Sequence, residues 1–286
     1  MKGEYNSEMA SVPKFDDIGE WSEVKLEILK KYAVAYSTIL TAQSNPPLYH
    51  VYIDAFAGPG YHVSRRTREF VAGSPLNALL VRPPFRDHYL IDIDATKVES
   101  LRGLVGNRTD VHVYHGDCNR VLLDHVFPHV RYEDYRRGLC ILDPYGLHLQ
   151  WKVIETAGHS KSIDLFLNFP VADMNRNVLW RDPEAVKESE IERMNSYWGD
   201  DSWRKIAYAT TTTLFGTPEK EANEVIAEAF RHRLKEVAGF GRVPAPLPMR
   251  NSKGAIVYYL FFASQKGTAE GIVEEIFDKY RRRGEK

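Results

Sequence analysis

Short apolar runs alternate along the chain with longer segments in which apolar residues recur at helical spacing. The runs lie at residues 49–56, 88–93, 111–115, 138–142 and 163–168. The helical segments before and between them lie at 21–36, 76–81 and 96–105. Strands separated by helices are typical of a mostly parallel sheet with helices on both faces. We therefore predict an α/β fold with five parallel strands.

Prolines and capping residues mark the ends of two helices. Asn45 and the two prolines after it end the first helix. Ser74 and Pro75 are predicted as the N-cap and the first helical residue of the second helix, which ends before Arg82 and another pair of prolines.

The pattern changes in the last third of the chain. Residues 181–239 are charged and mostly helical in character, with one ambiguous strand at 210–215. Two apolar runs at 243–250 and 255–263 flank a polar turn and predict an antiparallel hairpin, and a helix follows at 269–280. The predicted parts are an N-terminal helical segment (1–48), an α/β domain (49–180 and 240–286) and a helical insertion (181–239).

Composition narrows the class of protein. The 286 residues are 43% hydrophobic and 27% charged, as in globular proteins. The net charge is −1, so any contact with nucleic acid must use local basic patches. Two cysteines, Cys118 and Cys140, argue against a disulfide scaffold or a thiolate zinc site. Without a signal segment or a run long enough to span a bilayer, we expect a soluble cytoplasmic protein.

The ends of the predicted strands carry the candidate chemistry, because ligands of open α/β sheets bind at the carboxyl ends of strands. The first strand runs into D-A-F-A-G-P-G, which contains Asp54, Phe56, Gly58 and Gly60. The glycines allow a tight turn and a close approach of the backbone to a ligand. The pattern resembles motif I of the class I S-adenosylmethionine-dependent methyltransferases, which implies that these four residues hold the cofactor. The alternative is a simple Gly-Pro-Gly turn.

The second strand ends at two carboxylates, Asp92 and Asp94. An acidic residue at this place accepts the hydroxyls of a ribose in dinucleotide-binding folds. We favour Asp92 over Asp94 for this role. Asp92 follows Gly60 by 32 residues, where about 20 is usual, so 61–73 is predicted as an inserted loop. Its three arginines could face a phosphate, although we favour plain solvation.

The third strand ends at Asp117 and Cys118. Class I methyltransferases often have a carboxylate here that accepts from the adenine amino group, and the next side chain lies against the ring. The alternative is that Asp117 caps the helix near Arg120, and the two roles are compatible. We expect Cys118 to be a packing residue rather than a nucleophile, since the only basic neighbour in sequence is His115.

The fourth strand ends at Asp143, Pro144 and Tyr145, and this D-P-Y-G pattern resembles the D/N-P-P-Y/F/W motif of amino-group methyltransferases. In that motif the first side chain accepts hydrogen bonds from the target amine, and the aromatic ring stacks on the base. The second proline is missing here, and an Asp-Pro turn is the alternative. The fifth strand ends at Asn168 and leads into a polar loop with Asp173, either a substrate-binding loop or a linker.

The whole chain, from the N-terminal helix to the closing strand at 258–264, resembles the three-Cys-motif partner protein (TcmP) family. The resemblance implies a Rossmann-like class I methyltransferase fold, S-adenosylmethionine as cofactor, and a radical-SAM-like three-Cys-motif protein as partner. It implies no particular substrate. Lys25 of the N-terminal helix could reach the cofactor or substrate, but we favour a surface lysine, since Lys30 and Lys31 share its helix.

Three functions are compatible with these residues. The first is methyl transfer to a nucleic-acid amino group, with Asp143 and Tyr145 placing the amine and basic clusters at 65–68, 131–137 and 281–283 contacting phosphates. The second has a small molecule or a protein as acceptor. The third is a non-catalytic, cofactor-binding partner subunit that docks through its tryptophan-rich insertion. The scattered histidines predict no metal site.

Overall fold

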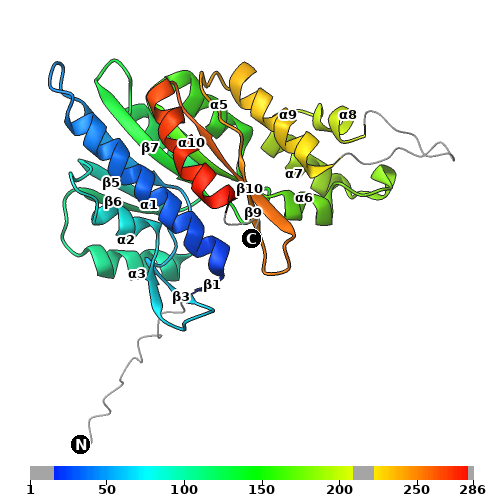
Figure 1. Cartoon of the computed structure of the whole chain (residues 1–286), viewed down its shortest axis with the longest axis horizontal. Helices are drawn as coiled ribbons and strands as arrows, with labels where there is room; N and C mark the ends of the chain where they lie inside the picture. The colour runs from blue at the N-terminus through cyan, green and yellow to red at the C-terminus, as the bar shows by residue number, and fades with distance from the viewer. Residues whose placement is uncertain (1–15, 209–221, 283–286) are drawn as a thin grey trace, which may run out of the picture.

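The computed structural model describes residues 16–208 and 222–282, and its centre is a seven-stranded sheet of order β6-β5-β2-β7-β8-β10-β9 (Figure 1). The strands are β2 (Tyr49–Asp54), β5 (Asp87–Asp92), β6 (Val111–His115), β7 (Arg136–Leu142), β8 (Ile163–Phe169), β9 (Leu247–Arg250) and β10 (Ile256–Ala263). The first five of these are parallel, and β10 runs antiparallel to both β8 and β9. This order and the antiparallel last strand are those of the Rossmann-like class I methyltransferase fold, which confirms the predicted fold class.

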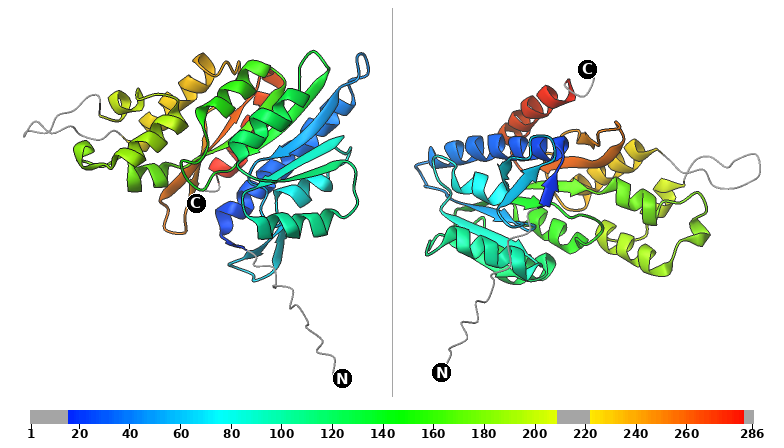
Figure 2. Two further views of the ribbon diagram at one scale, coloured as in Figure 1. Left: turned by 180° about the vertical axis from the view of Figure 1, so that it is seen from behind. Right: turned by 90° about the horizontal axis from the view of Figure 1, so that it is seen from below.

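Helices cover both faces of the sheet (Figure 2). One layer contains α1 (Glu20–Thr41), α2 (Ser74–Leu79), α3 (Ala95–Val105) and α10 (Gly267–Arg281). The other contains α4 (Cys118–Val121), α5 (Trp151–Ser160), α6 (Val171–Asn177), α7 (Glu188–Trp198), α8 (Trp203–Ala207) and α9 (Asn223–Glu236). Short turns at Leu122–Val126, Phe127–His129 and Pro183–Ala185 complete the helical segments.

The buried residues of the strands explain why the sheet is covered twice. Successive side chains of a strand point to opposite faces, so Tyr52 packs in the layer of α1 and Ile53 in the layer of α5. Strands with apolar residues on both faces can be stable only between two layers of helices. The edge of the sheet at the carboxyl ends of the parallel strands stays available for ligands.

Three predictions about individual elements are corrected. Gly73 rather than Ser74 is the N-cap residue of α2. The predicted loop at 61–73 contains a hairpin, β3 (Tyr61–Ser64) and β4 (Phe70–Ala72), and β1 (Asp16–Ile18) pairs with β3 to form a second small sheet. Strand β9 begins later than predicted, at Leu247. The ambiguous strand at 210–215 lies outside the described residues.

Candidate functional site

The turn after β2 adopts a conformation that requires glycine. Gly58 and Gly60 have φ angles of +65° and +92°, in the region where side chains are disfavoured. A Cβ atom on Gly60 would lie 2.5 Å from Leu104 Cδ1. The backbone N–H of Gly58 donates to Asp92 Oδ2 at 2.9 Å. The structure therefore brings together the predicted cofactor residues at the ends of β2 and β5.

Asp92 and Asp94 have different environments. Asp92 is half-buried, and its Oδ1 accepts from the N–H of Asp94 at 2.9 Å. Each of its oxygens keeps a lone pair for a further donor such as a ribose hydroxyl. Asp94 is exposed and caps α3, where it accepts from the N–H of Thr96 at 2.8 Å. The capping role accounts for Asp94, and Asp92 stays our predicted ribose ligand.

Asp54 is fully buried at the end of β2. Its carboxylate accepts from the N–H of Phe56 at 3.2 Å and from the Tyr52 hydroxyl at 3.2 Å. Burial raises the pKa of Asp54 to about 6, although a hydrogen bond with Ser74 acts in the opposite direction. The side chain reaches no surface in this structure, so it shapes the turn through the backbone of half-buried Phe56. A direct contact with the cofactor stays a prediction.

Asp117 and Cys118 start the helical segment after β6. Asp117 caps α4, since its Oδ1 accepts from the N–H of Arg120 at 3.1 Å. Its Oδ2 accepts from Asn119 Nδ2 at 3.3 Å, and the exposed side chain leaves room for a further donor. Cys118 is buried, and burial raises the pKa of its thiol to about 12. Its thiol is therefore a packing group rather than a nucleophile at neutral pH.

The position after β7 holds a compact polar cluster of three side chains. The ammonium group of Lys25, on α1, forms a short ion pair with Asp143 Oδ2. Asn168, at the end of β8, donates through Nδ2 to Asp143 Oδ1 at 3.0 Å. Sequence analysis favoured a surface position for Lys25, and this prediction is wrong: its side chain is only 13% exposed.

The surroundings of Lys25 keep it charged. Burial is the largest single influence and would lower the pKa of its ammonium group, but the charge of Asp143, its hydrogen bond to Lys25 and the nearby Tyr258 and Tyr145 together raise the pKa above its usual value. The Lys25 ammonium also lies 5.6 Å from the centre of the Tyr258 ring. Lys25 therefore faces Asp143 as a cation and is not available as a general base at neutral pH.

A cavity of about 240 Å³ lies over this cluster and is lined by Lys25, Asp143, Asn168 and Tyr258, among others. Two of these residues carry buried polar atoms, Asn168 Oδ1 and the Tyr258 hydroxyl, that make no hydrogen bond within the described part of the chain. Buried polar atoms of this kind are rare, because each costs about 1–3 kcal/mol. A ligand that enters the cavity could satisfy both.

Tyr145 forms the outer wall of this cavity and is 78% exposed. The Lys97 ammonium lies 5.9 Å from the centre of its ring. Beyond Tyr145 a larger groove, of about 890 Å³, continues between β1 and the β9–β10 turn, and Arg65 and Arg66 line it. An exposed ring between a small polar cavity and a wide groove is a suitable platform for a planar group.

The segment after β8 was predicted as a polar loop, but it is helix α6. Asp173 on this helix accepts from the N–H of Leu147 at 3.3 Å and lies 3.4 Å from the Arg193 guanidinium. A Cβ atom on Gly146 would lie 2.9 Å from Asp173 Oδ2. The glycine of the D-P-Y-G pattern therefore permits this close contact, which fixes the turn that carries Tyr145.

The basic clusters found in the sequence differ in their surroundings. Arg65 and Arg66 line the groove, whereas Arg68 pairs with Asp17 at 3.1 Å. Arg131 pairs with Asp134 at 2.8 Å on the surface. The cluster at 281–283 extends beyond the described residues.

The described residues contain neither a metal-binding cluster nor a membrane-spanning helix. No three His, Cys, Asp or Glu side chains within 16–208 and 222–282 are grouped so that they could hold a metal ion. No helix in the same ranges is long and apolar enough to cross a membrane.

One solved structure has a similar fold, and two others are only distantly similar. Protein LPL1258 of Legionella pneumophila str. Philadelphia 1, of the family DUF519, superposes with a TM-score of 0.52 and 13% identity over 91% of each chain. A putative methyltransferase from Thermobifida fusca YX has a TM-score of 0.39 and 13% identity over 85% of this chain and 82% of its own. M. jannaschii TYW2, in complex with AdoMet, has a TM-score of 0.34 and 11% identity over 85% of this chain and 75% of its own. At these identities the likeness concerns the fold alone.

The sequence itself matches no protein-family model and no curated protein. Membership of the three-Cys-motif partner family is therefore not confirmed and stays a prediction from the motifs.

Proposed function

We propose that this chain is an S-adenosylmethionine-dependent methyltransferase that acts on the amino group of a nucleic-acid base. The observation that carries the proposal is the cluster of Lys25, Asp143 and Asn168 beside the exposed Tyr145. It lies at the carboxyl end of β7, next to the glycine turn of β2, where the strand order reverses and open α/β sheets bind ligands.

The residues at the neighbouring strand ends fit the cofactor. The backbone of Gly58 and Gly60 would lie against its methionine part, Asp92 would accept from the ribose, and Asp117 from the adenine amino group. Bound S-adenosylmethionine supplies a methyl group on a positively charged sulfur, which is a good leaving group. The protein therefore has to position the acceptor and exclude water rather than supply a strong base.

The polar cluster fits an amine as acceptor. An amino group in the cavity would donate one N–H to Asn168 Oδ1, which accepts no hydrogen bond from the described residues, and the other to the carboxylate of Asp143. Lys25 holds that carboxylate in place through its contact with Oδ2. Both N–H groups would then be fixed, and the lone pair of the nitrogen would point toward the cofactor side.

The acceptor is proposed to be a base because of Tyr145. Its exposed ring offers a stacking surface worth about 1–3 kcal/mol for a planar base. Arg65 and Arg66 in the adjoining groove would contact the phosphates on either side. With a net charge of −1, the chain would bind a short single-stranded segment rather than grip a long duplex. The three-Cys-motif protein stays a proposed partner on the sequence resemblance alone.

The test compares variants that separate cofactor binding from transfer. Calorimetry should show S-adenosylmethionine binding that Asp92→Ala weakens and Asp143→Asn leaves largely intact. Transfer of radiolabelled methyl to single-stranded RNA and DNA should fall by about 100-fold or more in Asp143→Asn and Lys25→Met. Tyr145→Ala should raise the KM for the nucleic acid, whereas Tyr132→Ala, another exposed tyrosine, should not.

Two results would contradict the proposal. An unchanged transfer rate in Asp143→Asn would remove the amine-binding role of this cluster. The second result is methyl transfer to small molecules or proteins but to no nucleic acid, with an affinity for the acceptor that does not depend on salt. It would establish a small molecule or a protein as the acceptor.

A further inference from the structure

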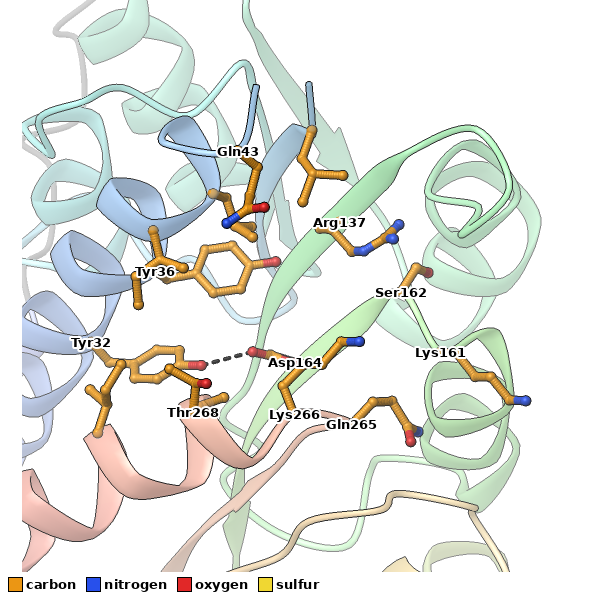
Figure 3. Close-up of a pocket in the computed structure, with 15 residues that line it drawn as sticks. Tyr32, Tyr36, Gln43, Arg137, Lys161, Ser162, Asp164, Gln265, Lys266 and Thr268 are labelled. Atoms are coloured by element: carbon orange, nitrogen blue, oxygen red, sulfur yellow. Dashed lines mark hydrogen bonds between the residues drawn. The ribbon is translucent and has the colours of Figure 1, made fainter. Parts of the chain in front are cut away.

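A cavity of about 330 Å³ lies at the opposite edge of the sheet from the candidate active site (Figure 3). Arg137 and Asp164, near the amino ends of β7 and β8, line it, whereas Asp143 follows the carboxyl end of β7. The remaining walls are the later turns of α1 and the first turn of α10. It shares no lining residue with the cavity and the groove around Tyr145.

Tyr36 presents an unpaired polar atom to this cavity. Its side chain is 7% exposed, and Figure 3 shows its ring extending from α1 with the hydroxyl directed into the cavity. In the described part of the chain this hydroxyl makes no hydrogen bond, whereas Tyr32, one turn earlier, donates to Asp164 at 2.7 Å. The hydroxyl faces the open space of the cavity, where a ligand atom could accept its hydrogen bond.

The acidic residue of the cavity is already engaged by the protein. Asp164 Oδ2 accepts from the Tyr32 hydroxyl, and Oδ1 accepts from the Ser264 hydroxyl at 2.6 Å. Burial raises the pKa of this carboxyl to about 6, although both hydrogen bonds act in the opposite direction. These two bonds tie Asp164 to α1 and to the residue that follows β10.

The other charged groups around the cavity are cations. Arg137, Lys161 and Lys266 all line it. The Arg137 guanidinium is held in place because Nη1 donates to the Tyr132 carbonyl at 3.2 Å and its carbon lies 3.9 Å from the centre of the Tyr132 ring. Its Nε and Nη2 make no hydrogen bond within the described residues and remain available for a carboxylate or phosphate.

The first turn of α10 adds donors on the same side. This helix has 15 residues, and its N-terminal N–H groups and dipole favour a negative charge. Thr268, in that first turn, lines the cavity. Apolar side chains also line the cavity, among them Ile39, Leu48 and Ile272. The cavity thus combines cationic and donor groups with apolar surface.

We propose that this cavity is a second ligand site, which binds a small organic anion. Its carboxylate or phosphate would lie between Arg137 and the first turn of α10, its apolar body against Ile39 and Ile272, and a polar atom of that body would pair with the Tyr36 hydroxyl. A volume of about 330 Å³ is at the lower end of the range for small-molecule pockets, roughly 300–1,000 Å³. The proposal does not depend on the methyltransferase function.

Matched probes test the site directly on the full chain. 1-Naphthoate and 1-naphthyl phosphate carry an anion on an apolar body, and 1-naphthamide is the neutral analogue. Fluorescence titration should show at least tenfold tighter binding of one anion than of the amide, and the preferred anion distinguishes a carboxylate from a phosphate site. Saturating S-adenosylmethionine should not displace the probe.

Variants locate the binding. Arg137→Gln should weaken anion binding by tenfold or more, Tyr36→Phe by about threefold, and Thr268→Trp should abolish it by filling the cavity. Arg131→Gln is the control, because Arg131 pairs with Asp134 on the surface outside the cavity. If Arg137→Gln does not fold, the test uses Lys266→Gln and Thr268→Trp, which should both weaken anion binding. Three results would overturn the proposal. The first is no saturable binding at millimolar probe, the second is binding that no substitution weakens, and the third is displacement of the probe by S-adenosylmethionine.

Discussion

The three aspartates at the ends of β2 and β5 have different roles because their environments differ. They are Asp54, Asp92 and Asp94. Asp54 is fully buried and holds the backbone of the glycine turn. Asp92 is half-buried and accepts from two backbone N–H groups, one of them from Gly58. Asp94 is exposed and caps α3. A sequence motif places a carboxylate at a strand end, but only burial and partners decide whether it can meet a ligand.

A pH-dependent contribution to stability is expected from Asp54. Its folded-state pKa of about 6 lies above the unfolded value of about 3.9, so the folded state binds the proton more tightly. The stability that this group contributes is present below about pH 4 and is lost as the pH rises to about 6. Asp54→Asn should therefore reduce the fall in unfolding free energy between pH 4 and 7 by about 2 kcal/mol, measured by urea denaturation at several pH values.

Asp94→Asn is a control that should change the pH dependence of stability in the opposite direction. Hydrogen bonds from the N–H groups of Thr96 and Lys97 lower the pKa of Asp94, so its contribution is present at neutral pH and is lost as the pH falls. This variant should lose stability at pH 7 and approach wild type in acid. If Asp54→Asn and wild type gave parallel stability curves, Asp54 would not be the buried acid that the structure describes.

Lys25 marks the limit of residue-level prediction from sequence. Asp143 and Asn168 could be placed near each other because the carboxyl ends of neighbouring parallel strands share an edge. Lys25 is 118 residues from Asp143 in sequence, and its position depends on how α1 crosses the sheet. That crossing is set by packing such as the edge-on contact of Tyr32 with Phe166, at 5.3 Å between ring centres, which no local pattern encodes.

At the scale of elements, the parallel strands were predictable and the small sheet was not. The strands are nearly continuous apolar runs because both of their faces are buried. The β3–β4 hairpin is short and partly exposed, and α1 and β2 separate it in sequence from its partner β1, so its sequence resembles a polar loop. It nevertheless contributes to the candidate site, since the loop between β3 and β4 supplies Arg65 and Arg66 to the groove.

The glycine turn after β2 gives a prediction at this scale. Gly60→Ala should cost about 1–3 kcal/mol, chiefly through the backbone angle of +92°, because the side chain of Leu104 is 40% exposed and can move aside. The strained turn should also weaken S-adenosylmethionine binding, measured by calorimetry. Gly103→Ala is the matched control, since a Cβ there has no atom within 4 Å and alanine favours α3. Equal effects of the two substitutions on stability and binding would contradict the role given to the turn.

At the scale of the whole molecule, the helices of residues 188–236 pack into the core of the sheet. Phe230 on α9 lies 4.6 Å from Phe169 of β8 and 5.5 Å from Phe261 of β10, measured between ring centres. On its other side it contacts Tyr197 and Trp198 of α7. These rings belong to one continuous cluster of buried residues that extends across β7 and β2. Composition predicted a helical insertion here, but the charged surface of its helices concealed the apolar face that joins the sheet.

Phe230→Ala should therefore affect the protein as a whole. Loss of a fully buried phenylalanine costs about 3–5 kcal/mol, because a cavity replaces the ring. Unfolding in urea should be followed by tryptophan fluorescence, to which Trp198 of α7 and Trp203 of α8 contribute among the five tryptophans, and by far-UV circular dichroism, which also reports on the sheet. Both probes should give one shared midpoint that the substitution shifts. Val225→Ala, on the exposed side of α9, should leave the midpoint nearly unchanged. If the substitution shifted the midpoint seen by fluorescence but not the midpoint seen by circular dichroism, these helices would unfold as a separate unit. The shared core would then not transmit a change in α9 to β8, the strand that carries Asn168 at the candidate site.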